Sequence, residues 1–270
     1  MAEDFGVSGR GKFYEETGAI RDVVQNHLLQ LVALLAMDAP SSQDSDAIRD
    51  EKAIILKAMR SLDPSDAVRG QYRGYRQQDG VAANSQVETF VAVKFLIDSW
   101  RWADVPFYVR AGKCLPVRAT EITVDLKRPP QTVFGETEPP RSNYYRFRIS
   151  PVVKITLGAR AKITGEAMRG EEAELVAVHQ SADEMAPYER LLLSAMQGDE
   201  TLFVREDSVE VQWRIIDPLL EQPPPVYEYP PGTWGPAEAD HLIAADGGWY
   251  NPEPSGNTGA SGSQPAKEES

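Results

Sequence analysis

A run of strand-like segments in the middle of the chain is the feature that most constrains its fold. These segments are rich in β-branched and aromatic residues, which favour strands, and several of the connections between them are short. Short connections favour antiparallel pairing, because a parallel crossover needs a dozen or more residues. The predicted strands are Val87–Ile97, Val105–Ala111, Glu121–Leu126, Tyr144–Ile149, Val152–Leu157 and Glu174–Val178.

Helical periodicity flanks this strand-rich region on both sides. In the first helix, predicted from Ala19 to about Met37, the apolar positions follow the spacing of one packed face: Val24, Leu28, Leu31 and Leu35. The other predicted helices are Ser45 or Asp46 to about Leu62, Tyr188–Met196, Ser208–Leu219 and the short Glu238–Ala245, and the proline-rich residues 223–231 are predicted to be extended.

Together these patterns predict an α+β protein with a large, mainly antiparallel sheet and helices packed on one face. We expect one domain over residues 1–250. Residues 251–270 are of low complexity, and their composition predicts a disordered tail.

Composition excludes several classes of function. The formal net charge of −13 disfavours binding to nucleic acid or to anionic membrane surfaces. No apolar run approaches the roughly 20 residues of a membrane span, and the N-terminus does not resemble a secretory signal. The single Cys114 suits a reducing cytoplasm. The three histidines, His27, His179 and His241, lie too far apart to form a zinc-ligand pair. We therefore expect a cytoplasmic protein without a metal site.

A dinucleotide-binding fingerprint is not found in the sequence. The segment GVSGRG, from Gly6 to Gly11, resembles one superficially. However, no predicted strand precedes it, its glycine spacing differs, and no acidic residue follows at the expected distance. We interpret it as a glycine-rich loop that carries Arg10.

His27 is the first candidate for chemistry, and two interpretations are open. It lies near the predicted buried stripe of the first helix, where it could be a core histidine satisfied by one hydrogen bond. Alternatively, its imidazole could act as a general base near neutral pH. Asp22 precedes His27 by five positions, about 140° around an α-helix. Asp22 is therefore either a solvated carboxylate in the first turn or a separate hydrogen-bond acceptor.

A basic segment follows one of the predicted strands. Arg110-Ala-Gly-Lys113 ends that strand, and Arg118 lies five residues further on. The segment is either an ordinary basic strand end or a cationic corner that receives an anion, since a strand end opening into a glycine-bearing loop commonly carries site residues.

Several long segments, in order, resemble the glucose-6-phosphate dehydrogenase family. The first, EDFGVSGRGKFYEETGAIRDVVQNHLLQLVALLAM, resembles the part of these enzymes that follows their coenzyme domain. The resemblance covers positions 3–250, and Ser8 stands where many relatives have glutamate. The matching segments are Glu3–Met37, Asp46–Met59, Thr89–Ile122, Tyr188–Leu220, and Gly235-Pro236 with Trp249.

This resemblance implies an activity and a set of site residues. The family oxidises the C1 hydroxyl of glucose 6-phosphate to the lactone and reduces NADP⁺, or NAD⁺ in some members. The histidine of its RD-x-x-Q-N-H motif, here His27, is the general base. Glu3 and Asp22 match carboxylates that bind sugar hydroxyls, and Lys113 and Arg118 match basic residues that bind the substrate. We do not transfer the second, structural NADP site of some members.

Two family features are expected to be missing from these 270 residues. They are the doubly wound N-terminal coenzyme domain with its glycine-rich NADP loop, and an RIDHYLGKE-like segment that supplies phosphate-binding residues. Three hypotheses follow. The chain is an enzyme fragment that cannot turn over alone, or an assembly partner that forms a homodimer, a larger oligomer or a complex with a split coenzyme domain, or a sugar-phosphate binding module.

Overall fold

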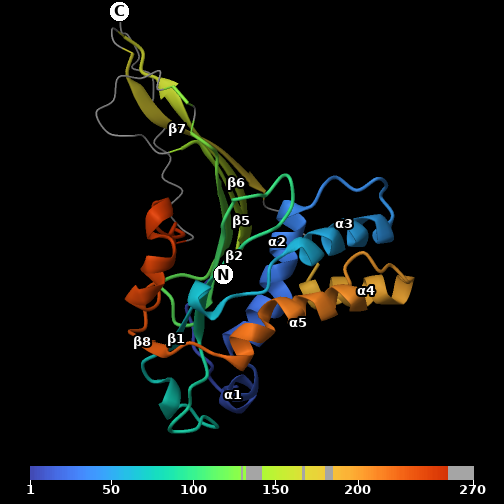
Figure 1. The fold of residues 1–270 in the computed structure, drawn as a ribbon, viewed down its shortest axis with the longest axis vertical. Coiled ribbons are helices and arrows are strands. Elements are labelled where there is room, and N and C mark those ends of the chain that lie inside the picture. Colours follow the sequence, from blue (N-terminus) through green and yellow to red (C-terminus); the bar gives the residue numbers. More distant parts are fainter. Residues whose placement is uncertain (129, 132–141, 166–167, 180–184, 255–270) are drawn as a thin grey trace, which may run out of the picture.

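The computed structural model describes residues 1–254, apart from residues 129, 132–141, 166–167 and 180–184. It shows two mainly antiparallel sheets with helices gathered to one side (Figure 1). The predicted α+β class is therefore confirmed. Most of the predicted disordered tail, residues 255–270, lies outside the described residues.

The predicted helical segments are confirmed, apart from the π-helix at residues 20–28 and two further corrections. The second helix ends at Ala58 rather than Leu62, and residues 237–246 form short 3₁₀ turns instead of an α-helix. The helices are α1 (Gly11–Ala19), η1 (Ile20–Leu28), α2 (Leu29–Ala36), α3 (Ser45–Ala58), α4 (Pro187–Gln197) and α5 (Glu206–Glu221), and the 3₁₀ turns are η2 (Pro64–Asp66), η3 (Tyr75–Gln77), η4 (Ala237–Leu242) and η5 (Ala244–Asp246).

The strands divide between two four-stranded sheets. The first has the order β3-β2-β1-β8, and the second has the order β4-β5-β6-β7. Every pair is antiparallel except β1 with β8. The strands are β1 (Ala67–Tyr72), β2 (Phe90–Phe95), β3 (Phe107–Gly112), β4 (Thr120–Asp125), β5 (Tyr144–Ser150), β6 (Val153–Lys162), β7 (Gly170–His179) and β8 (Val226–Tyr229).

Sequence patterns missed β1, and they predicted the β8 segment to be extended without assigning it to a sheet. In β1 the polar residues Arg69 and Gln71 are buried, so the strand shows no alternation of apolar and polar positions. The short β8 lies at the edge of its sheet among prolines, which are tolerated in edge strands but not in central ones.

Ala2 links the two sheets. It forms a parallel bridge with Gly112 at the end of β3 and an antiparallel bridge with Ala119, just before β4. Its N–H donates to the carbonyl of Ala119 at 2.7 Å, and its carbonyl accepts from the N–H of Ala119 at 2.9 Å. The N-terminal residues therefore lie between the ends of the sheets.

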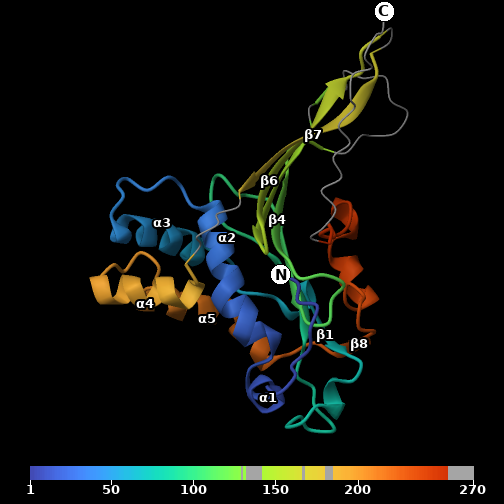
Figure 2. The same cartoon turned by 180° about the vertical axis from the view of Figure 1, so that it is seen from behind.

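The main core lies between the first sheet and the helices. On β2, Val91, Val93 and Phe95 are fully buried against η1, α2, α3 and α5. The alternate residues Phe90 and Ala92 point to the other face, where the N-terminal loop and the C-terminal segment around η4 cover them. Figures 1 and 2 show helices α2 to α5 on one side of β1 and the C-terminal segment on the other.

The helix that carries the predicted catalytic motif is not a regular α-helix. Residues 20–28 form a π-helix, in which hydrogen bonds run from residue i to i+5. Val24 and Leu28 are buried as predicted, but the next predicted core positions, Leu31 and Leu35, are partly exposed. After the π-helix the buried positions are Leu29, Val32, Ala33 and Ala36. They differ from the predicted ones because a π-turn contains more residues than an α-turn.

The second sheet has one apolar face, called here the open sheet face. Cross-strand partners lie on the same face of an antiparallel pair, and register pairs Ile122 with Phe147 and Leu157 with Leu175. None of the members of this face is buried, and Leu175 is 71% exposed. They are Ile122, Val124, Tyr145, Phe147, Ile149, Ile155, Leu157, Ala159, Ala173, Leu175 and Ala177.

The opposite face of this sheet is polar. Arg148 pairs with Glu121 at 2.8 Å between Nε and Oε2, and Arg146 pairs with Glu174. The guanidinium carbon of Arg146 lies 4.2 Å from the ring centroid of Tyr250, in the C-terminal segment. In the part of the chain that the structure describes, no helix is both long and apolar enough to span a bilayer.

Candidate functional site

Residues 3–5 lie along the loop that follows β3, held by backbone hydrogen bonds. The N–H of Glu3 donates to the carbonyl of Gly112 at 3.0 Å, and the carbonyl of Glu3 accepts from Leu115 at 2.9 Å. The carbonyl of Phe5 accepts from the N–H of Cys114 at 3.0 Å. These bonds bring residues more than 100 positions apart in sequence into one local site.

Glu3 and Lys113 form an ion pair at the centre of this site. Lys113 Nζ lies 2.5 Å from Glu3 Oε2, and the two side chains are 9% and 23% exposed. The ammonium group also lies 5.3 Å from the ring centroid of Phe5 and 5.0 Å from that of Tyr14. Aromatic faces attract cations at such distances, so the carboxylate and both rings stabilise the ammonium group.

Tyr14, from α1, is a buried phenol whose ring lies beside the Lys113 ammonium. Burial raises its pKa well above the usual value, and the charges of Glu88, Asp22 and Glu3 raise it further. The phenol is therefore neutral at physiological pH. Asp22 and Glu3 come from different elements, and both charges act in the same direction on the pKa of this phenol.

Asp22 and His27 lie at the two ends of the π-helix η1. The half-buried Asp22 is in the first turn, and the exposed His27 is in the last. The interpretation of His27 as a core histidine is therefore wrong. The expectation that the two residues face different directions assumed an α-helix. In an α-helix, residues four apart lie on the same side. In a helix with i to i+5 hydrogen bonds, residues five apart do so instead.

Arg118 lies on the outer side of the site. Its side chain is exposed, and its guanidinium carbon is 5.9 Å from the Phe5 ring centroid. Phe5 thus stands beside both basic residues, Lys113 and Arg118. Two cations, with carboxylates close by, form a pattern suited to an anionic polyol, because carboxylates accept hydrogen bonds from hydroxyl groups.

The glycine-rich loop before α1 has a packing role. Gly11 lies so close to the backbone of Asp79 that an added Cβ would be 2.1 Å from its carbonyl oxygen. Gly9 adopts a φ of +72° in the turn, a conformation that glycine tolerates. Arg10 is exposed, with its guanidinium carbon 4.9 Å from the Phe13 ring centroid.

The structure brings together Glu3, Lys113 and Arg118 around Phe5, and it places Asp22 and His27 on one helix, η1. Sequence reasoning missed three members of the site, Phe5, Tyr14 and Glu88. For Glu88 a signal existed, because a carboxylate at the start of the apolar run VETFVAV is unusual for a buried strand. Phe5 and Tyr14 gave no such signal.

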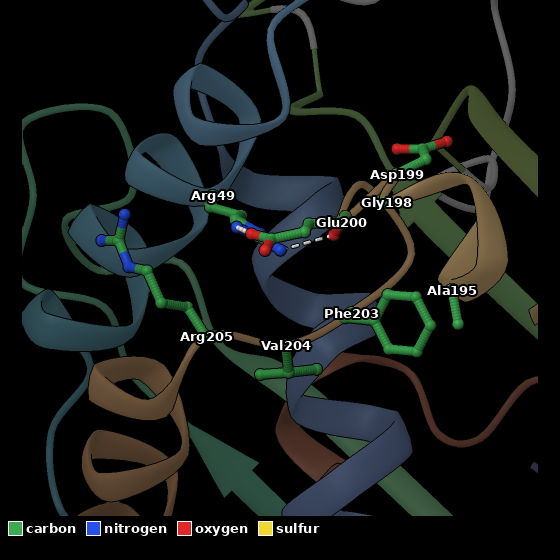
Figure 3. Close-up of a pocket in the computed structure, with 8 residues that line it drawn as sticks. All are labelled: Arg49, Ala195, Gly198, Asp199, Glu200, Phe203, Val204 and Arg205. Atoms are coloured by element: carbon green, nitrogen blue, oxygen red, sulfur yellow. Dashed lines mark hydrogen bonds and ion pairs between the residues drawn. The ribbon is translucent and has the colours of Figure 1, made fainter.

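A separate hollow of about 410 Å³ lies between α3, α4 and the loop before α5 (Figure 3). Its one buried cation, Arg49, is committed to Glu200, with contacts of 2.6 Å to both the side chain and the backbone carbonyl. The hollow therefore reflects how Arg49 anchors the 198–205 loop. Its lining residues are Arg49, Ala195, Gly198, Asp199, Glu200, Phe203, Val204 and Arg205.

Comparison with known proteins decides the family. The model of the glucose-6-phosphate dehydrogenase C-terminal domain matches residues 1–251. The chain belongs to the glucose-6-phosphate dehydrogenase family. It is 45% identical over 253 residues to glucose-6-phosphate 1-dehydrogenase 1 of Mycobacterium tuberculosis, and 41% identical over 272 residues to the enzyme of Aggregatibacter actinomycetemcomitans.

Solved structures of the family have the same fold. A glucose-6-phosphate 1-dehydrogenase from Mycobacterium avium is 44% identical, with a TM-score of 0.87 over 94% of this chain and 55% of that one. A glucose-6-phosphate dehydrogenase solved in complex with its substrate, glucose 6-phosphate, is 35% identical, with a TM-score of 0.82 over 93% of this chain and 55% of that one. The two curated relatives are matched over 93% of this chain and 54% and 55% of their own lengths, so the chain spans about half of each.

The ion pair at the site centre makes a first prediction. Glu3→Gln should lower the free energy of unfolding by about 2 kcal/mol, because a mostly buried ammonium loses its partner. Lys113→Met in the same chain should recover much of that loss. Urea unfolding of the wild type, both single variants and the double variant gives the coupling energy. Additive losses would show that the two side chains do not interact.

A second prediction concerns α5, whose first turn carries a bidentate ion pair. Hydrogen bonds from Arg205, at 2.7 and 3.0 Å, lower the pKa of Asp207 to about 2. A carboxylate with a lowered folded-state pKa stabilises the fold above its unfolded pKa of about 4 and loses that contribution as the pH falls toward about 2.

Asp207→Asn should therefore reduce the free energy of unfolding at pH 7 by up to about 1 kcal/mol, since the pair is partly exposed. The difference from the wild type should shrink between pH 5 and pH 3 in urea titrations. Asp217→Asn, at an exposed position on the same helix, is the matched control. A difference that stays constant with pH would contradict the assignment.

Proposed function

We propose that this chain forms the substrate-binding half of a glucose-6-phosphate dehydrogenase, which oxidises glucose 6-phosphate to the lactone with NADP⁺. The observation that carries the proposal is the mostly buried ion pair of Glu3 and Lys113 beside the rings of Phe5 and Tyr14, with Arg118 at its outer side. Family membership and the similarity to an enzyme solved with glucose 6-phosphate support the same substrate.

In this proposal each residue has a chemical task. Glu3 and Asp22 accept hydrogen bonds from sugar hydroxyls, and Lys113 and Arg118 supply positive charge for the substrate. Exposed His27 takes the proton of the C1 hydroxyl as carbonyl character develops at C1. A phosphorylated hexose needs this local positive charge, because the chain as a whole is strongly acidic.

The described residues do not fit an NADP site of the dinucleotide type. Their only parallel strand pair is β1 with β8, and no glycine-rich turn leads from a strand into a helix there. We propose that the cofactor binds to the part of the enzyme that corresponds to the unaligned half of its relatives. The 270-residue chain by itself should therefore form no NADPH from glucose 6-phosphate and NADP⁺. We also propose a cytoplasmic location for the whole enzyme, because the free thiol of Cys114 suits a reducing compartment.

The proposed site makes a third prediction. Glucose 6-phosphate added to the chain should shift the NMR signals of the His27 imidazole and the Lys113 side chain, with weak but saturable binding. Lys113→Met should weaken this binding at least tenfold, since a charge-assisted contact is lost. Glucose and inorganic phosphate serve as ligand controls, and Lys162→Met, an exposed lysine on β6, serves as the variant control. Shifts spread over the surface, or none at all, would contradict the assignment.

The open sheet face supports assembly as a second role. An apolar face of four strands whose described residues are half-buried or exposed is typical of an interaction surface, and in this family the antiparallel sheet makes the subunit interface. We propose that a second copy of the chain covers this face through a two-fold, isologous contact. The stacked rings of Tyr145 and Phe147, 6.3 Å apart, would lie within it.

Assembly is tested by a pair of neighbouring substitutions, the fourth prediction. Leu175→Glu places a charge on the open sheet face, whereas Val176→Glu places the same charge on the opposite face of the same strand. Sedimentation velocity should show a dimer or larger species for the wild type and for Val176→Glu, and dissociation for Leu175→Glu. A monomeric wild type would exclude this role.

A further inference from the structure

Glu88 is a buried carboxylate that the proposed mechanism does not use. It lies just before β2, is 4% exposed, and accepts hydrogen bonds at the start of the π-helix, from its first residue and from the residue before it. The N–H of Ala19 donates to the backbone carbonyl of Glu88 at 3.0 Å, and the N–H of Ile20 donates to its Oε1 at 3.1 Å. A helix leaves its first N–H groups without partners inside the helix, so Glu88 acts as the cap of η1.

Gly18 makes this capping possible. Its φ of +64° breaks the chain direction between α1 and η1. A Cβ at this position would lie 2.4 Å from Glu88 Oε1. Only glycine allows both the backbone conformation and the close approach of the carboxylate.

The other oxygen of Glu88 is held by Arg69 of β1. Arg69 Nη1 lies 3.1 Å from Glu88 Oε2, and the two side chains are 10% and 5% exposed. Arg69 is itself fixed by the carbonyl of Pro224 at 2.9 Å. Burial raises the pKa of Glu88, while the Ile20 N–H and the arginine act in the opposite direction. A buried ion pair of this kind contributes more to geometry than to net stability.

Thr89, which follows Glu88 and precedes β2, contacts the backbone of Lys113. The N–H of Lys113 donates to the carbonyl of Thr89 at 2.9 Å. The hydroxyl of Tyr229 donates to the carbonyl of Lys113 at 2.7 Å and lies 3.2 Å from Thr89 Oγ1. Residues 88 and 89 therefore hold two parts of the site at once, the helix with Asp22 and His27 and the loop with Lys113.

We propose that Glu88 is a positioning residue of the hexose-phosphate site, which sets the place of the π-helix, and so of Asp22 and His27, relative to Lys113. The inference rests on the proposed function of this site. Glu88 acts through the backbone of Ala19 and Ile20 and through Arg69, and it does not touch the substrate.

Three variants test this role, and a fourth is the control. Glu88→Ala removes both contacts of the carboxylate. Glu88→Gln keeps an acceptor for the Ile20 N–H but loses the charge that faces Arg69. Gly18→Ala leaves the carboxylate intact and forces it away from the helix start. Glu121→Gln breaks the equally buried pair with Arg148 on the second sheet.

Two measurements on the full 270-residue chain separate positioning from stability. NMR titration with glucose 6-phosphate gives the affinity, and urea unfolding gives the stability. Glu88→Ala and Gly18→Ala should weaken binding about tenfold, as loss of a group that orients site residues commonly does. They should also shift the His27 imidazole signal and speed hydrogen exchange at Ile20. Glu88→Gln should restore most of the affinity, and Glu121→Gln should lower stability without changing affinity.

The outcomes distinguish failure of the inference from failure of the proposed function. Wild-type affinity in folded Glu88→Ala, or in both Glu88→Gln and Gly18→Ala if Glu88→Ala does not fold, would overturn the positioning role. A wild-type chain that does not bind glucose 6-phosphate would count against the proposed function instead. In that case unchanged His27 signals and Ile20 exchange in the variants would overturn the positioning role, and the expected changes would support it.

Discussion

The backbone pairing of residues 2–5 with the end of β3 and the loop after it is the constraint on which the rest of the structure depends. Ala2 bridges both sheets, and the bonds made by Glu3 and Phe5 continue along residues 112–115. The same contact that joins the sheets brings Glu3 to Lys113. Architecture and candidate site therefore share one set of hydrogen bonds, and a shift of one residue in this pairing would turn the Glu3 carboxylate to the other face.

The far end of the chain closes the opposite side of the junction. Arg110 of β3 lies between the rings of Trp234 and Trp249, 4.7 and 4.8 Å from their centroids, and its pKa is lowered to about 10 by burial. Next along the chain, Tyr250 contacts Arg146 of β5. The C-terminal segment thus binds one arginine of each sheet. The open sheet face lies on the other side of the second sheet from Arg146, and it connects the fold to the proposed assembly.

Much of the fold was predictable because local patterns were strong. Alternation in ITVDL and YYRFRI identified two strands, and their apolar and polar faces correspond to the open sheet face and its opposite. Prediction failed for β1, whose Arg69 is buried because Glu88 and Pro224 compensate it. No pattern within six residues can reveal partners from elsewhere in the chain. For the site, motif resemblance named Glu3, Asp22, His27, Lys113 and Arg118, but Phe5, Tyr14 and Glu88 emerged only from their contacts.

The sequence alone determined the α+β class, the family resemblance and the residue types available for chemistry, because these depend on composition, periodicity and motif order. The tertiary structure decided the helix type of residues 20–28 and hence the relative direction of Asp22 and His27. It also decided the exposure of the imidazole and the burial of Lys113 against Glu3. The physical reason is that a π-helix and a buried charge are locally unfavourable. They persist only where groups distant in sequence, such as the Glu88 carboxylate at the start of that helix, supply the missing partners.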